Sequence, residues 1–150
     1  MNAFSYLSHE SLGFMTITAN RVMSSCLRRK MREAGIDLTS EQWGVLVLLW
    51  NMNSLTQDEL AQIACVDKSS MSRILSLMED KGLIDRRVDP SSARRKIIRA
   101  TARAHAVQQS SLAVARDVVA RALSNVSEED CATCLKVLGA VKKNLQENEK

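Results

Sequence analysis

Apolar residues recur at alternating spacings of three and four near both ends of the chain, as they do along one face of an α-helix. The first stretch predicts a helix over residues 8–34, and Gly35 follows it as a terminator. Two more stretches predict a helix over residues 101–124 and a last one that starts at residues 127–130. Each helix has one apolar stripe that must pack against other helices. The stripes consist of Leu12, Met15, Ala19, Val22 and Cys26, then Leu112, Ala115, Val119 and Ala122, then Cys131, Cys134, Leu138, Val141 and Leu145.

The middle of the chain contains shorter elements with clear start signals. Capping-box patterns at residues 39–42 and 56–59 predict two short helices, with a loop over residues 51–54 between them. A tight turn at residues 65–67 precedes a further helix, capped by Asp67 or Ser69, that ends near Lys81. Residues 83–88 and 96–100 mix apolar and basic side chains around a turn cluster, which predicts a β-hairpin. Because two strands alone are marginally stable, we expect the hairpin to lean on the helices.

The composition supports one mainly helical domain over residues 1–150. A chain of 150 residues is about the size of a single domain. Aromatic residues make up only 3% of it and Pro90 is its one proline, too few for a sandwich or barrel of many strands. The expected fold class is therefore mainly α with a small β-hairpin.

The sequence has no feature that predicts a membrane span, a bound cofactor or a metal site. The longest apolar run, Val45 to Trp50, is far shorter than the ~20 residues of a membrane span, and no signal peptide is visible. We therefore expect a cytoplasmic protein with no membrane partner and with reduced cysteines. We expect no cofactor and no metal, because no phosphate-binding loop and no His-Glu-x-x-His pattern is present. The same absences argue against an enzyme.

Positive charge is concentrated in the second half of the middle region. Eight basic and two acidic side chains lie between Lys81 and Arg103, although the whole chain has a net charge of only +4. Such a local excess indicates a polyanion partner, whereas a solvated basic surface is the plain alternative.

The helix that starts near Ser69 combines features of a DNA-reading helix. Met71, Ile74, Leu75 and Met78 form one apolar stripe, while small polar and basic side chains lie beside it. In a helix-turn-helix the second helix enters the major groove, where Ser and Arg side chains reach base edges. Arginines of the hairpin could enter the minor groove or bind phosphates. An ordinary surface helix is the alternative.

Several segments in this order resemble the winged helix-turn-helix of the MarR family of transcription regulators. They are Leu60-Ala61, residues 66–73, residues 78–84 with Arg86, residues 38–46 upstream, and Asp89-Pro90 with Arg94 and Thr101 downstream. The resemblance covers residues 36–103 by motif, while the outer helices are similar only in length and order.

The resemblance implies a winged helix-turn-helix region at residues 37–100 and a dimerisation region formed by residues 1–36 and 101–150. It implies a homodimer on a palindromic operator of double-stranded DNA, usually a repressor, often released by a small and frequently phenolic ligand. Pattern and resemblance together give these expected DNA contacts: Thr56, Gln57, Lys68, Ser69, Ser70, Ser72, Arg73, Arg86, Arg94 and Arg95. The residues that would bind the effector are not identified.

The sequence departs from the family pattern at three places. Ser92 and Ala93 stand where the wing usually carries Asp and then a basic residue, so Arg95 could replace some of its contacts. Cys65 stands at a turn position that is often Gly, where we expect a different turn or a small energetic cost. Ala104 replaces a frequent Gly after the wing, which predicts an uninterrupted helix over residues 101–124.

Two alternatives concern side chains outside the winged helix. Cys131 and Cys134 form a single CxxC, which makes a cysteine-based redox-sensing DNA-binding regulator the second hypothesis. Small core residues on the apolar stripe are the plainer interpretation of both cysteines. The basic cluster of Arg28, Arg29, Lys30 and Arg32 could bind a membrane surface or flanking phosphates, or stay solvated.

Overall fold

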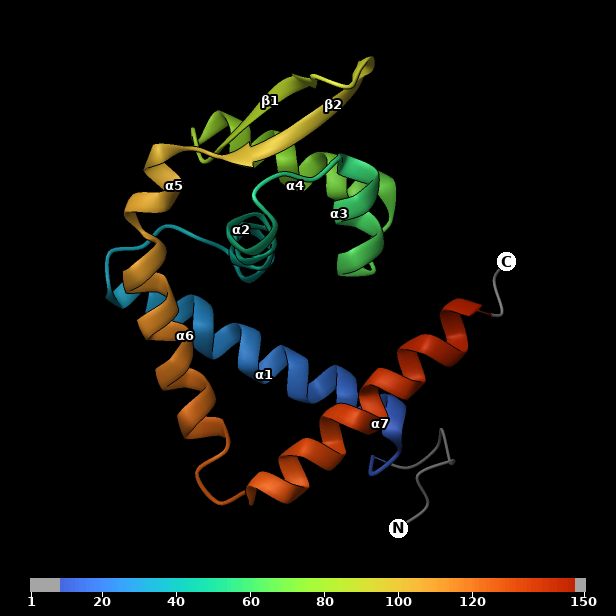
Figure 1. Ribbon diagram of the computed structural model, residues 1–150. Helices are drawn as coiled ribbons and strands as arrows, with labels where there is room; N and C mark the ends of the chain where they lie inside the picture. The colour runs from blue at the N-terminus through green and yellow to red at the C-terminus, as the bar shows by residue number, and fades with distance from the viewer. Residues whose placement is uncertain (1–8, 148–150) are drawn as a thin grey trace.

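A helical scaffold carries one antiparallel hairpin on one of its sides (Figure 1). The computed structural model describes residues 9–147, except for the side chains of residues 93, 94 and 147. Its elements are α1 (Leu12–Glu33), α2 (Ser40–Met52), α3 (Gln57–Ala64), α4 (Lys68–Asp80), β1 (Ile84–Asp89), β2 (Ser92–Ala100), α5 (Ala102–Ala106), α6 (Gln108–Ala122) and α7 (Glu128–Glu147). The expected fold class, mainly α with a small hairpin, is confirmed.

Both predicted capping boxes form and fix where the central helices begin. The Thr39 hydroxyl accepts from the Gln42 backbone N–H, and the Gln42 side chain accepts from the Thr39 N–H. Thr56 and Glu59 exchange the same two hydrogen bonds at the start of α3. Each box satisfies backbone donors that the first turn of a helix leaves unpaired.

The core lies between α2, α3 and α4 and below the hairpin. Leu46, Leu60, Leu75 and Met78 have no exposed surface, and Ile98 of β2 is 1% exposed. Burying a side chain of this size stabilises a fold by roughly 1.5–3 kcal/mol. The predicted apolar stripe of α4 therefore anchors this helix, and the rest of its surface is left for other contacts.

The hairpin is tied to the helices by a contact that the sequence did not predict. β1 and β2 pair in antiparallel register with Ile84 opposite Ala100, and a register shift follows Val88. Leu55 forms an isolated bridge with Ile98, in which each backbone N–H donates to the other's carbonyl, at 3.2 and 2.7 Å. The predicted loop at residues 51–54 was partly wrong, because α2 continues to Met52 before this bridge.

The predicted uninterrupted helix over residues 101–124 is wrong. It divides into α5 and α6 at Val107, whose φ of −97° and ψ of 0° depart from helical values. The hydroxyls of Ser110 and Ser111 donate to the carbonyls of Val107 and Gln108 in the first turn of α6, in addition to the regular bond from the Ser111 N–H to the Val107 carbonyl.

The outer helices leave much of their apolar surface uncovered within one chain. α1 packs against α6, whereas α7 makes only sparse contacts with the other described elements. Val22 is 70% exposed and Leu135 is 66% exposed. Cys134 is exposed and Cys131 is partly exposed, so the expected burial of the CxxC cysteines is not met within a single chain. No helix within residues 9–147 is long and apolar enough to cross a membrane.

Cys65 adopts a left-handed backbone conformation, at a turn position that is often glycine in the family. Its φ is +53° and its ψ is +43°, directly after the last residue of α3. A non-glycine residue pays a steric cost there, although the conformation satisfies the end of the helix: the Cys65 N–H donates to Gln62 and the Val66 N–H to Ala61. The small energetic cost anticipated from the sequence is the outcome here, not a different turn.

We expect Cys65→Gly to raise the free energy of unfolding by about 0.5–1 kcal/mol, because glycine adopts a positive φ without steric cost. Urea denaturation followed by circular dichroism measures the difference. Cys26→Gly in the interior of α1 is the control, and it should lower stability, because glycine has a lower helix propensity than cysteine. A Cys65→Gly variant as unstable as the control would contradict the strain assigned to Cys65.

Candidate nucleic-acid interface

The N-terminal half of α4 presents the polar face that the sequence predicts. Met71 is 1% exposed and points to the core, which directs Lys68, Ser69 and Arg73 outwards, while Ser70 and Ser72 are partly exposed. Arg73 has no ion-pair partner among the described residues. A long, unpaired guanidinium beside several hydroxyls can donate to base edges or to phosphates.

Asp67 holds the first turn of α4 in place. One of its carboxylate oxygens accepts from the Ser70 backbone N–H at 2.8 Å and from the Ser69 hydroxyl at 2.6 Å. Hydrogen bonds from the side chains of Ser69 and Ser70 are the first causes that lower the pKa of Asp67, with the Ser70 N–H adding to them. Asp67 is therefore charged at neutral pH, and its negative charge interacts favourably with the positive end of the dipole of α4.

α3 and α4 are also linked by an exposed ion pair. The ammonium of Lys68 lies 3.0 Å from a carboxylate oxygen of Asp58, and both side chains are largely in solvent. Pairs of this kind contribute about 0–1 kcal/mol, so the link orients Lys68 without committing it strongly.

Two other predicted contacts, Gln57 and Arg86, are engaged with each other. Arg86 donates to Glu79 of α4 at 3.0 Å and to the Gln57 side chain at 3.4 Å. The Arg86 side chain is only 25% exposed. Arg86 thus joins the hairpin to α3 and α4, and a direct contact with DNA by Arg86 or Gln57 stays a prediction.

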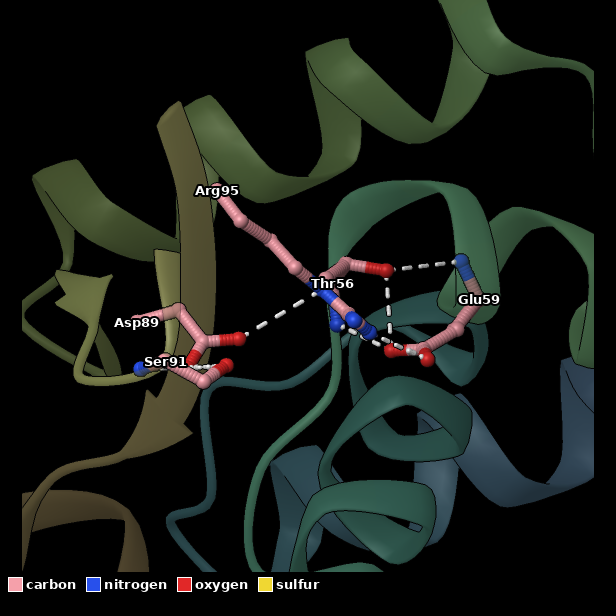
Figure 2. A network of polar contacts seen from close by, with 5 residues as sticks. All are labelled: Thr56, Glu59, Asp89, Ser91 and Arg95. Carbon is pink, nitrogen blue, oxygen red and sulfur yellow. Dashed lines mark hydrogen bonds and ion pairs between the residues drawn. The ribbon is translucent and has the colours of Figure 1, made fainter. Parts of the chain in front are cut away.

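The wing keeps one acidic partner for an arginine, Asp89, at its start. Asp89 accepts from the backbone N–H and the hydroxyl of Ser91, at 2.8 and 2.7 Å, and lies 3.6 Å from Nε of Arg95 (Figure 2). These bonds, with those of Ser91 first, lower the pKa of Asp89. Asp89 therefore orients a wing arginine although Ser92 and Ala93 replace the usual residues. The Arg94 side chain lies outside the described residues.

A shallow groove of about 620 Å³ separates the start of α3 from the hairpin. Thr56 is partly exposed at its edge, but its hydroxyl and backbone N–H are occupied by the Glu59 carboxylate. Glu59 also accepts from Arg95 across the groove at 2.7 Å. The groove is lined by Thr56, Gln57, Asp58, Glu59, Arg86, Arg95, Lys96 and Ile98.

Sequence reasoning missed Glu59 and Asp89 as parts of this face. The capping box did predict that Glu59 bonds to Thr56, and the turn cluster did include Asp89. The approach of Asp89 to Arg95 depends on how the two strands pair within the hairpin. The approach of Glu59 to Arg95 depends on how the hairpin folds over α3, which no local pattern encodes.

Other predicted features lie apart from this face. The basic cluster at the end of α1 is separated from α4 and the hairpin by α2 (Figure 1), and Arg29 and Lys30 pair with Glu33. Within residues 9–147, no three His, Cys, Asp or Glu side chains gather closely enough to hold a metal ion.

Comparisons with known proteins agree with this geometry. A family model described as MarR family matches residues 38–96. A curated Bacillus subtilis protein, the uncharacterized HTH-type transcriptional regulator YdgJ, is 26% identical over 78% of this chain and 71% of its own length.

Solved structures share the fold over most of the chain. A probable transcriptional regulator from Pseudomonas aeruginosa is 25% identical with a TM-score of 0.77, covering 87% of this chain and 96% of that one. A mutant MarR from E. coli, solved in complex with operator DNA, is 22% identical with a TM-score of 0.78, covering 87% and 92%.

The capping role of Asp67 predicts a specific dependence of stability on pH. Because its folded pKa lies below the usual value of about 3.9, its contribution is present above that value and is lost as pH falls through the lower folded pKa. Between pH 6 and pH 2, Asp67→Ser should therefore lose less stability than the wild type, since serine caps without titrating. Urea unfolding at both pH values measures this, and equal losses would argue against the cap.

Proposed function

Because the chain belongs to the MarR family of transcriptional regulators, we propose that it is a repressor that binds a palindromic operator as a homodimer and is released by a small ligand. The family and the relatives are regulators of transcription and not enzymes. The repressor role, the operator and the effector are the parts we propose. The observation that carries the proposal is the exposed polar face of α4, fixed from behind by its buried stripe.

The dimensions and chemistry of α4 suit the major groove. Its 13 residues form a helix about 20 Å long, and the groove, about 12 Å wide, admits one helix. Lys68, Ser69, Ser70, Ser72 and Arg73 occupy its N-terminal half, the part that contacts base edges in helix-turn-helix proteins. We propose that Arg73 reads a base and that the hydroxyls and Lys68 contact bases or phosphates. Residues 37–100 would form this DNA-binding region.

A second copy of the chain would cover the apolar surface of the outer helices. Val22 and Leu135 are each about two-thirds exposed, and Phe14 and Ile17 are about half exposed. Several large apolar side chains exposed on the same two helices, α1 and α7, indicate an interaction site. A twofold dimer formed by residues 1–36 and 101–150 would bury it and would present two α4 helices to the two halves of a palindrome. The proposed operator follows from this symmetry.

A small cavity is the proposed seat of the effector. It measures about 150 Å³ and lies where the winged helix meets the outer helices, between Ile36, Lys81, Leu83, Arg103 and Val107. Asp37 also lines the cavity and pairs with Lys81 at 2.8 Å, so we propose Arg103 as the cation that a phenol or an aromatic carboxylate would meet there. The alternative signal is oxidation of cysteine, for which Cys65 and Cys134 are exposed. Operator affinity measured with added phenols, and separately after treatment with peroxide, distinguishes the two.

Selection of duplexes from a randomised library tests the function itself. We expect enrichment of a palindrome whose half-sites lie about one helical turn, roughly 10 base pairs, apart. On the enriched duplex, Arg73→Ala should lose about 1–3 kcal/mol of discrimination against unrelated DNA, because Arg73 is proposed to read a base. Arg87→Ala, which removes an arginine paired with Asp85 inside the hairpin, is the control. Enrichment of no sequence would overturn the proposal.

The homodimer predicts the effect of a charge on α7. Leu135→Glu should give monomers in sedimentation experiments and should weaken operator binding, because a buried unpaired carboxylate is costly at an apolar interface. Lys136→Glu, its exposed neighbour, tests for a general effect of added acid and should remain dimeric. A dimeric Leu135→Glu protein would place the interface elsewhere.

A further inference from the structure

Arg95 connects the tip of the hairpin to the start of α3, as Figure 2 shows. Its Nη2 donates to Oε1 of Glu59 at 2.7 Å, and its Nε lies 3.6 Å from Oδ2 of Asp89. Glu59 uses its other oxygen to accept from the backbone N–H and the hydroxyl of Thr56, at 2.7 and 2.8 Å. One carboxylate therefore completes the cap of α3 and also holds an arginine of the wing.

Both acids have structural reasons to stay where they are. Hydrogen bonds from Thr56, before the charge of Arg95, lower the pKa of Glu59. Those from Ser91 do the same for Asp89, whose side chain is only 15% exposed. The two carboxylates are thus charged and fixed on either side of the Arg95 guanidinium.

This arrangement is unfavourable for a phosphate at the Arg95 guanidinium. A phosphate that approached it would also approach the fixed carboxylates of Glu59 and Asp89, and like charges at such distances repel. If Arg95 swung away to meet DNA, Glu59 would keep its bonds to Thr56 and would be left as an unpaired negative charge in the groove.

We propose that Arg95 is a positioning residue, which holds the wing against α3 through Glu59 and Asp89 and does not itself bind a phosphate. This inference rests on the proposed function. The hairpin is also joined to the helices by the bridge between Leu55 and Ile98 and by the bonds of Arg86. Arg95 precedes Ile98 by three residues in β2 and lies closer to the tip. Fixing the tip relative to α3 and α4 sets where the remaining wing side chains meet the DNA.

Glu59→Gln separates positioning from simple electrostatics because the two give opposite signs. Gln can still accept from Thr56 and keep the cap of α3, as Gln42 does for Thr39 in α2. Removing a negative charge from a DNA-facing groove should by itself tighten binding. Loss of the Arg95 partner should instead weaken it. We expect Glu59→Gln and Arg95→Gln each to weaken binding to the enriched duplex by about three- to tenfold, with a double variant no weaker than Arg95→Gln alone.

The salt dependence of binding gives the second readout. Affinity falls as salt rises, and a lost phosphate contact makes the slope of log affinity against log salt concentration shallower by about 0.9. A lost positioning contact leaves the slope unchanged. We expect the wild-type slope for Arg95→Gln. Arg95→Lys should recover part of the affinity, since its ammonium can still pair with Glu59. Arg87→Gln is the matched control, because Arg87 pairs with Asp85 within β1 and bonds to no α3 residue in the described part of the chain.

The outcomes distinguish this inference from the function on which it rests. A shallower slope for Arg95→Gln together with tighter binding by Glu59→Gln would make Arg95 a phosphate ligand and overturn the inference alone. Unchanged affinity in both variants would also overturn it. Absence of any sequence preference in the wild-type protein would overturn the proposed function first, and the inference with it.

Discussion

Burial of one side of α4 is the interaction on which the rest of the structure depends. Met71, Leu75 and Met78 are essentially inaccessible to solvent and pack against the helices α2 and α3. With these three side chains inside, the rotation of α4 about its axis is fixed, because residues three and four apart share a face. The serines and Arg73 then have to face outwards. The polar surface is thus a geometric consequence of the apolar one, with Asp67 fixing where the helix starts.

Sequence patterns predicted the elements whose causes are local. Both capping boxes, the stripe of α4 and the hairpin depend on residues within about four positions of one another or on simple alternation, and all of them appear. What the sequence did not reveal depends on distant partners. The bridge of Leu55 to Ile98 and the bond of Glu59 to Arg95 join segments about 40 residues apart. The break at Val107 was missed because no glycine or proline, the usual sequence signals of a helix end, lies between Ala102 and Ser111.

Acidic partners change how the basic face should be understood. Lys81, Arg86, Arg87 and Arg95 each pair with a carboxylate, so four of the eight basic side chains between Lys81 and Arg103 already have an acidic partner. The non-specific electrostatic attraction of these basic side chains to phosphates is reduced as a result, while their ion pairs hold them in defined positions. Arg73, without such a partner, differs from them. A face built this way favours discrimination between duplexes over general affinity, because oriented groups lose more when their targets are misplaced.

The connection between the winged helix and the outer helices sets what an effector could change. Lys81, at the end of α4, pairs with Asp37 in the segment that follows α1, at 2.8 Å. Arg103 and Val107 approach the same cavity from α5 and from the break before α6. A ligand between these segments would contact the end of α4 and the helices proposed for dimerisation at once. It could alter DNA binding only by binding more tightly to one spacing of the two α4 helices than to another.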